Sequence, residues 1–194
     1  MKTIFFKRVG AYLLDFIIVT FIVAIITVNF KTNNVVIEKM NSLISGVASE
    51  EITLEEYSNQ IFEINYEYQR AIIPSTIVSV VINVVYFIIF AFLNKGQTLG
   101  KKVFKIKVVN QDGKNPSIWN MLLRSIWLYG IITGIVNIIG VYVLNVKLFN
   151  YTSTTVNYIY YGFIIISFFM VIYKKDGRGI HDIIGRTSVK EEVK

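Results

Sequence analysis

Residues 9–30 read VGAYLLDFIIVTFIVAIITVNF, a run in which Asp15 is the only charged side chain. A helix rises about 1.5 Å per residue, so these roughly 22 residues extend for about 33 Å and cover a hydrocarbon core about 30 Å thick. A secretory signal peptide is the alternative, because Lys2, Lys7 and Arg8 form a basic start. The length of the run, its carboxylate and the lack of a small-residue cleavage pattern after it favour a membrane span.

Three further apolar runs follow, over residues 71–93, 118–144 and 156–173. Pro74 lies at the start of the first of them, where a helix tolerates proline, and Ser117 is a suitable N-cap for the second. Apolar residues make up 54% of the 194 residues, more than an ordinary soluble fold carries. The sequence therefore predicts one all-α membrane domain, residues 1–194, with four transmembrane helices.

The charges predict the orientation of these helices. Lysine and arginine gather in the first eight residues, in residues 94–117 and in residues 174–194, whereas residues 31–70 are rich in glutamate. Basic residues that flank short loops are retained on the cytoplasmic side. We therefore expect a multi-pass protein of the cell membrane with both termini in the cytoplasm, a cytoplasmic loop at 94–117, a cytoplasmic tail at 174–194 and an extracytoplasmic insertion at 31–70.

Two segments outside the spans have a recognisable periodicity. Thr53 and Glu56 form a capping-box pattern before a run of helical spacing, which predicts a helical extracytoplasmic insertion. Phe104, Ile106 and Val108 alternate with lysines, which is typical of a strand, and residues 186–190 offer a second strand. A small cytoplasmic β-ribbon is expected there.

The basic segments also suggest partners. Four lysines of the cytoplasmic loop are expected to contact the anionic head groups of the lipid bilayer, namely Lys101, Lys102, Lys105 and Lys107. A protein partner that binds residues 31–70 or 94–117 is the alternative, and so is a homo-oligomer. Nucleic acid is not expected, because the basic residues lie beside apolar spans and not on one soluble face.

No cofactor or metal is expected either, since cysteine is absent and the single histidine has no carboxylate cluster at ligand spacing.

Asp15 is the most informative residue, because a carboxylate in the middle of a span costs on the order of 3 kcal/mol and needs a partner. Arg8 lies on nearly the same helix face but about two turns away, too far for a simple direct pair. Arg124 lies about as deep in the third span, so we predict a contact between Asp15 and Arg124. That pair would either fix helix packing or serve function.

These residues resemble the RDD family of bacterial membrane proteins, which is named for one arginine and two aspartates. Arg8 and Asp15 match the first two, and Asp182 matches the second aspartate. The resemblance extends over a central block and a final block, Gly96-Gln97-Thr98-Leu99-Gly100-Lys101-Lys102 to Arg124 and Gly179-Ile180-His181-Asp182 to Thr187. It implies a bacterial cell membrane protein for which cation/proton exchange is suggested in some members, with Arg8, Asp15, Arg124 and Asp182 as an ion, proton or structural charge site.

Two smaller features stay open at this stage. Asn83, Thr133 and Asn137 lie within predicted spans, where they either line a polar pathway or bond to neighbouring helices. His181 precedes Asp182, and such a pair forms a turn or cap more often than a proton relay.

Two functional interpretations follow. In the first, the chain transports a small cation or protons, and Asp15 titrates under the influence of Arg8 and Arg124. In the second, it is a membrane-embedded accessory, regulatory or immunity-type protein that binds a protein or a lipid. An enzyme is not expected, because the sequence contains no nucleophile–base pair, phosphate-binding loop or dinucleotide motif.

Overall fold

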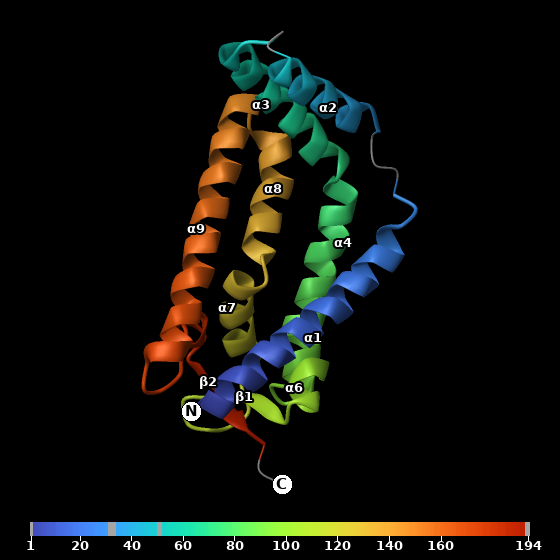
Figure 1. Ribbon diagram of the computed structural model, residues 1–194. Helices are drawn as coiled ribbons and strands as arrows, with labels where there is room; N and C mark the ends of the chain where they lie inside the picture. Colours follow the sequence, from blue (N-terminus) through green and yellow to red (C-terminus); the bar gives the residue numbers. More distant parts are fainter. Residues whose placement is uncertain (1, 31–33, 50–51, 193–194) are drawn as a thin grey trace.

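The computed structural model describes residues 2–30, 34–49 and 52–192, which form mostly helices (Figure 1). Three of the described helical stretches are long and apolar enough to cross a membrane: Ile4–Thr27, Ile73–Leu93 and Val146–Tyr173. A fourth stretch, Ile118–Leu128 with Ile131–Val143, passes the same test as a pair bent by 69°. The apolar runs of the sequence thus become the long helices.

The first two long helices are α1, Lys2–Thr27, and a composite of α4, Ile73–Val84, a π-helical segment η1, Val85–Phe90, and α5, Ala91–Leu93. α1 begins at residue 2 instead of residue 9. In η1 the wider turn buries Tyr86, Phe87 and Ile88 together. A π-helical insertion often marks a functional position in a helix.

The third stretch consists of α7, Ile118–Leu128, and α8, Ile131–Val143. Ser117 caps α7, as predicted, with its side chain accepting from the Asn120 amide. Gly130 separates the two helices with φ +66°, a left-handed conformation that is unfavourable for residues with a side chain. A bent pair therefore replaces the straight span expected over 118–144.

The last long helix, α9, runs from Val146 to Tyr173 and begins well before the expected residue 156. Asn145 caps it by accepting from the Leu148 amide. The polar residues of its first turns bind neighbouring elements. Asn150 donates to the Phe62 carbonyl oxygen at 3.0 Å, and Ser153 donates to Asn137 Oδ1 at 2.9 Å.

The segment between α1 and α4 forms two helices, α2, Asn34–Ala48, and α3, Leu54–Ala71. They share a small hydrophobic core of Val36, Leu43 and Ile64. The predicted capping box of Thr53 and Glu56 opens α3, and only Ile72 separates α3 from α4. Both helices lie at one end of the molecule (Figure 1).

The opposite end carries α6, Leu99–Val103, α10, Ile180–Ile184, and a two-stranded antiparallel sheet. Strand β1, Ile106–Asn110, pairs with β2, Thr187–Glu191, so that Val108 faces Val189. Ile106, Val108 and Val109 are buried against the helices. The predicted β-ribbon is thus confirmed as a sheet of two strands.

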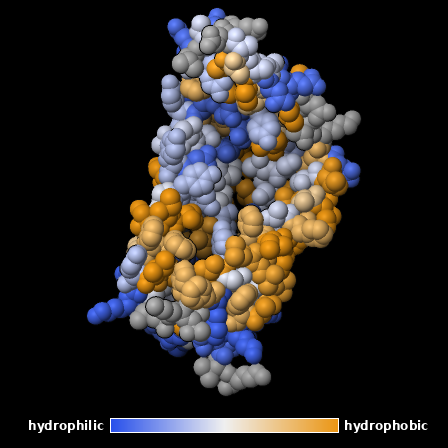
Figure 2. All heavy atoms as spheres, viewed as in Figure 1, coloured by the Kyte–Doolittle hydropathy of each residue, from blue (hydrophilic) through white to orange (hydrophobic). Residues whose placement is uncertain are grey.

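In Figure 2, hydrophobic residues gather over the lower part and the sides of the long helices, while more hydrophilic residues lie at the two ends and over the upper part. The same view shows a hollow near the middle of this face, between the long helices. Many large apolar side chains of α1 and α9 are exposed, including Phe16, Phe21, Ile165 and Phe169. Such an apolar exterior is what a lipid environment requires.

Candidate functional site

Asp15 lies at the centre of the first charge cluster and is 1% exposed. Its Oδ1 accepts from the Tyr86 hydroxyl at 2.6 Å and from the Gly100 amide at 2.8 Å. Its Oδ2 accepts from the Thr98 hydroxyl at 2.5 Å and lies 3.9 Å from Lys101 Nζ. The buried carboxylate therefore has hydrogen bonds from η1 and α6 and a cationic neighbour, which offset the cost of burial.

The short helix α6 explains why the sequence carries Thr98, Gly100 and Lys101 together. Thr98 caps the helix by accepting from the Lys101 amide, and its hydroxyl hydrogen is then free to bind Asp15. A Cβ atom at Gly100 would clash with the Ala11 carbonyl oxygen and lie 2.8 Å from Asp15 Oδ1. Glycine is required here because α6 approaches α1 closely.

Asp182 lies at the centre of the second cluster and is fully buried. Arg8 Nη2 donates to Oδ2 at 2.5 Å, and Arg124 Nη1 donates to Oδ1. The Gly179 amide donates to Oδ2 at 3.1 Å. One carboxylate of α10 thus binds two arginines, one from α1 and one from α7.

The predicted contact between Asp15 and Arg124 is wrong. Arg124 binds Asp182 and the Thr187 hydroxyl, and the cationic neighbour of Asp15 is Lys101. Equal depth along the two helices did not predict the pairing, because α6 packs against α1 and α10 packs against α7, and these short helices supply closer partners.

His181 lies between the two arginines and α9. Arg8 Nη2 lies 3.3 Å from His181 Nε2, and a guanidinium can only donate, so Nε2 accepts. The ring hydrogen of the neutral form is then on Nδ1, which donates to Ser167 Oγ at 2.6 Å. Burial holds the pKa of His181 well below its ordinary value of 6.5, and the charges of Arg124 and Arg8 lower it further. His181 is therefore neutral at physiological pH and connects Arg8 of α1 to Ser167 of α9 through hydrogen bonds.

Lys101 was expected to contact lipid head groups, but it is 7% exposed and donates to the Thr98 hydroxyl. Burial lowers the pKa of Lys101 from 10.5 to about 8; the nearby Asp15 carboxylate opposes this, and the charges of Arg124 and Arg8 add to it. Lys102 and Lys105 are exposed, and Lys107 is half-buried. Only these three remain available for the predicted head-group contacts.

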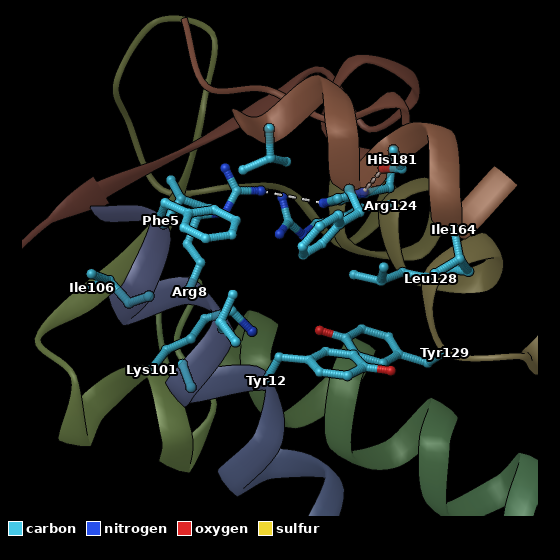
Figure 3. A pocket seen from close by; sticks show the side chains of 16 residues that line it. Phe5, Arg8, Tyr12, Lys101, Ile106, Arg124, Leu128, Tyr129, Ile164 and His181 are labelled. Carbon is cyan, nitrogen blue, oxygen red and sulfur yellow. Dashed lines mark hydrogen bonds between the residues drawn. The ribbon is translucent and has the colours of Figure 1, made fainter. Parts of the chain in front are cut away.

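A cavity of about 260 Å³ lies between the two charge clusters, which we call the cationic cavity. Arg8, Lys101 and Arg124 reach it from α1, α6 and α7, and His181 closes one side (Figure 3). Figure 3 shows the guanidinium groups of Arg8 and Arg124 close together on one wall, opposite the rings of Tyr12 and Tyr129. The remaining wall is apolar, with Phe5, Val9, Leu128, Ile164, Phe168 and Val171.

A second cavity of about 510 Å³, the polar cavity, lies nearer to α2 and α3. Asn83, Thr133 and Asn137 all line it, together with Gln69, Thr76 and Ser79. Asn83 donates to Ser79 of its own helix, and Thr133 donates to the Gly130 carbonyl oxygen. The three residues singled out for a polar pathway therefore lie at one cavity.

Tyr12 and Tyr129 line both cavities. Their rings stack with centroids 6.0 Å apart and an interplanar angle of 14°, and Phe87 of η1 also stacks on Tyr129. The aromatic stack is thus the wall between the polar and the cationic cavity.

Sequence reasoning missed Tyr86, Thr98 and Lys101 as partners of Asp15, and Ser167 as the partner of His181. Thr98, Gly100 and Lys101 stand together in one short motif, and this clustering was the sequence signal that could have pointed to them as partners of Asp15. Within the described residues, no group of three or more histidine or carboxylate side chains is placed to hold a metal ion.

Comparison with known proteins identifies the family of the chain. The sequence model of the RDD family matches residues 3–186. The uncharacterized protein YxaI of Bacillus subtilis (strain 168) is 29% identical over 119 residues, which cover 61% of this chain and 59% of YxaI. No solved structure matches. Because the family match extends over nearly the whole chain and includes Arg8, Asp15 and Asp182, this protein belongs to the RDD family.

Proposed function

We propose that this protein transports a small solute together with protons across the bacterial cell membrane. The observation that carries the proposal is the pair of cavities within the helices, one polar and one cationic, which meet at the stacked rings of Tyr12 and Tyr129. Alternating access needs a barrier between an inner and an outer cavity that opens to one side at a time, and the stacked rings stand where such a barrier would lie.

The proposed topology has four spans, with the bent pair of α7 and α8 counted as one. An even number of spans puts both termini on one side. The end with α6 and the sheet carries the clustered lysines, so the rule for basic loops assigns it to the cytoplasm, and the end with α2 and α3 to the outside. The cationic cavity then faces inward and the polar cavity outward.

The proton site of this proposal is the pair of Lys101 and Asp15. Lys101 reaches both the carboxylate and the cationic cavity, so its ammonium group releases a proton to cavity water and regains one from it. The proton is the small cation that suits this site, because a metal ion in the cavity would meet the charges of Arg8 and Arg124. Of the small cations that the sequence allowed, we therefore propose the proton, and its movement is coupled to that of another solute.

Accessibility to thiol reagents tests the passage, because the chain has no native cysteine. Asn83→Cys, in the polar cavity, should react with a membrane-impermeant reagent only from outside. Ile164→Cys, in the cationic cavity, should react only from the cytoplasmic side. Val81→Cys and Ile165→Cys are matched controls on the same two helices, and because their side chains point outward they should stay unreactive in the bilayer. Reaction of both cavity variants from one side would contradict the proposed passage.

Flux is the second measurement. A pH-sensitive dye trapped in proteoliposomes reports proton movement while gradients of sodium, potassium and small carboxylates are imposed in turn. Asn83→Leu removes a polar group from the passage without breaking a bond between helices and should slow the flux, whereas Val81→Leu should not. A pH change equal to that of protein-free liposomes under every gradient would refute transport.

An accessory role is the second candidate, and the helices α2 and α3 favour it. They have a hydrophobic core of their own, and Glu38, Glu55 and Glu63 are exposed on their surface. In this alternative, deletion of residues 35–65 abolishes function while the spans still insert. Transport predicts a milder effect of the same deletion, because neither Asp15 nor the cationic cavity belongs to the deleted segment.

A further inference from the structure

The cationic cavity contains hydrogen-bond donors that no acceptor among the described residues uses. Arg124 is 3% exposed, and its bonds to Asp182 and Thr187 both come from Nη1. Within the described residues, Nε and Nη2 of Arg124 have no acceptor among protein groups. No fully buried side-chain nitrogen or oxygen of the described residues lacks a partner, so these two nitrogens are accessible from the cavity that Arg124 lines. A ligand or water in the cavity can therefore accept hydrogen bonds from them.

Two hydroxyl groups add to these donors. Within the same described residues, the hydroxyls of Tyr12 and Tyr129 make no hydrogen bond to the protein. Figure 3 shows the Tyr129 ring, which follows the end of α7, with its hydroxyl pointing into the cavity. Lys101 Nζ, which donates to Thr98 and lies against Asp15, also faces this space.

The charges around the cavity do not balance. Arg8, Lys101 and Arg124 are cationic, whereas Asp15 and Asp182 are their carboxylate partners. His181 adds no charge, for the reason given above. One positive charge is left over in a buried space, and a single negative charge on a ligand would neutralise it.

The shape and lining of the cavity define the rest of the ligand. Most of its wall is apolar, and Phe5 of α1 meets Phe168 of α9 with ring centroids 5.7 Å apart. Its volume of about 260 Å³ approaches the lower end of ordinary small-ligand pockets. An inorganic anion would use the donors but leave the apolar wall without a partner.

We infer that the cationic cavity binds an organic anion with one carboxylate or phosphodiester group, which carries a single negative charge, and an apolar chain. The anionic group accepts from Arg124, Lys101 and the Tyr129 hydroxyl, and the chain lies against Leu128, Ile164 and Phe168. As a statement about the transported solute this rests on the proposed function, but binding is measured without any flux. A free acid and an anionic lipid share this chemistry.

The test uses the full chain in phosphatidylcholine nanodiscs and radiolabelled decanoate, with empty nanodiscs as background. Decanoate should bind saturably, and neither decanol nor decyltrimethylammonium should displace it at equal concentration. Acetate should bind more weakly than decanoate because it lacks the chain. Equal displacement by unlabelled decanoate, decanol and decyltrimethylammonium, which share a ten-carbon chain, would overturn the assignment, since it would mean that the site does not recognise negative charge.

Two matched pairs of variants locate the binding. Ile164→Trp fills the cavity and should weaken decanoate binding by about tenfold or more, whereas Ile165→Trp, on the exposed side of α9, should leave it unchanged. Tyr129→Phe removes one donor to a charged group and should weaken binding by about tenfold, in contrast to Tyr158→Phe on the exterior. If Ile164→Trp binds decanoate like the parent protein, the cavity is not the site.

Nanodiscs that contain phosphatidylglycerol distinguish the two sources of the ligand. Competition between this lipid and decanoate would assign the anionic group to a lipid, and unchanged decanoate affinity would assign it to a soluble acid; both outcomes support the inferred chemistry. The two proposals fail separately. If decanoate binds but Asn83→Cys and Ile164→Cys do not react from opposite sides of the membrane, transport alone is refuted. If the two variants react from opposite sides but decanoate does not bind, the inferred ligand alone is refuted.

Discussion

At the scale of single residues, Asp15 illustrates how a buried carboxylate is held by donors. Three hydrogen bonds reach it, from Tyr86, Thr98 and Gly100. The sequence identified Asp15 as a residue in need of partners, because hydrocarbon cannot solvate a charge. It could not identify the partners, since their approach depends on how α6 folds back against α1.

Asp15→Asn should reduce both stability and proton-coupled flux. Its side-chain amide has one oxygen and introduces two donors, so a donor among Tyr86, Thr98 and Gly100 loses its acceptor. The expected loss in unfolding free energy is on the order of 3 kcal/mol. Thermal unfolding in detergent and proton flux in proteoliposomes measure the two effects. Asp112→Asn, in an exposed turn, is the control, and equal melting temperatures for the two variants would contradict this account.

Lys101 gives a prediction about pH. Its pKa in the folded protein, about 8, is below the ordinary value of 10.5, so the unfolded chain binds more protons between these two values. Stability from this group therefore rises with pH from about 8 to 10.5. The melting temperature of the parent protein should increase relative to that of Lys101→Met across this window, measured at matched pH. A constant difference between the two proteins would show that Lys101 does not titrate there.

At the scale of elements, the sequence predicted the long helices and the sheet because both have strong local signals. An apolar run long enough for a membrane and an alternation of valine or isoleucine with lysine are readable without tertiary information. The early start of α9 was missed because Asn150 and Ser153 look like loop residues until their partners on α3 and α8 are known. The bend at Gly130 was missed because its neighbours are apolar and no proline marks it.

Gly130 offers a test at this scale. Its φ of +66° is disfavoured for alanine, so Gly130→Ala should lower the unfolding free energy by about 1–2 kcal/mol. Gly162 lies inside α9 with no atom within 4 Å of an added Cβ, so Gly162→Ala should raise it by up to about 1 kcal/mol. Chemical or thermal unfolding measures whether each variant lowers or raises the unfolding free energy. A stabilising Gly130→Ala would mean that the bend does not depend on the left-handed conformation.

At the scale of the whole molecule, Asp182 connects distant parts of the chain. It joins α10 to Arg8 in α1 and to Arg124 in α7, and β2 then pairs with β1. The resemblance to the RDD family pointed to these residues as a group, but the pairing required the fold, because the C-terminal tail returns to the spans only in three dimensions.

Removal of the tail after residue 175 should therefore be strongly destabilising. The truncation takes Asp182 from both Arg8 and Arg124, and breaking a buried ion pair typically costs about 3–5 kcal/mol. Expression level in the membrane and the melting temperature of the purified protein measure the effect. Truncation after Glu192 leaves β2 intact and serves as the control. A tail-less protein as stable as this control would show that another group neutralises the arginines.

The late position of Asp182 in the chain has a consequence for biosynthesis. A ribosome adds about 5–20 residues per second, so the 58 positions from Arg124 to Asp182 take about 3–12 seconds. During that time both arginines have already emerged, and their shared counter-ion does not yet exist. The nascent spans must wait in an incompletely assembled form, and a chain that stops early exposes the uncompensated charges to the proteases that remove unfinished membrane proteins.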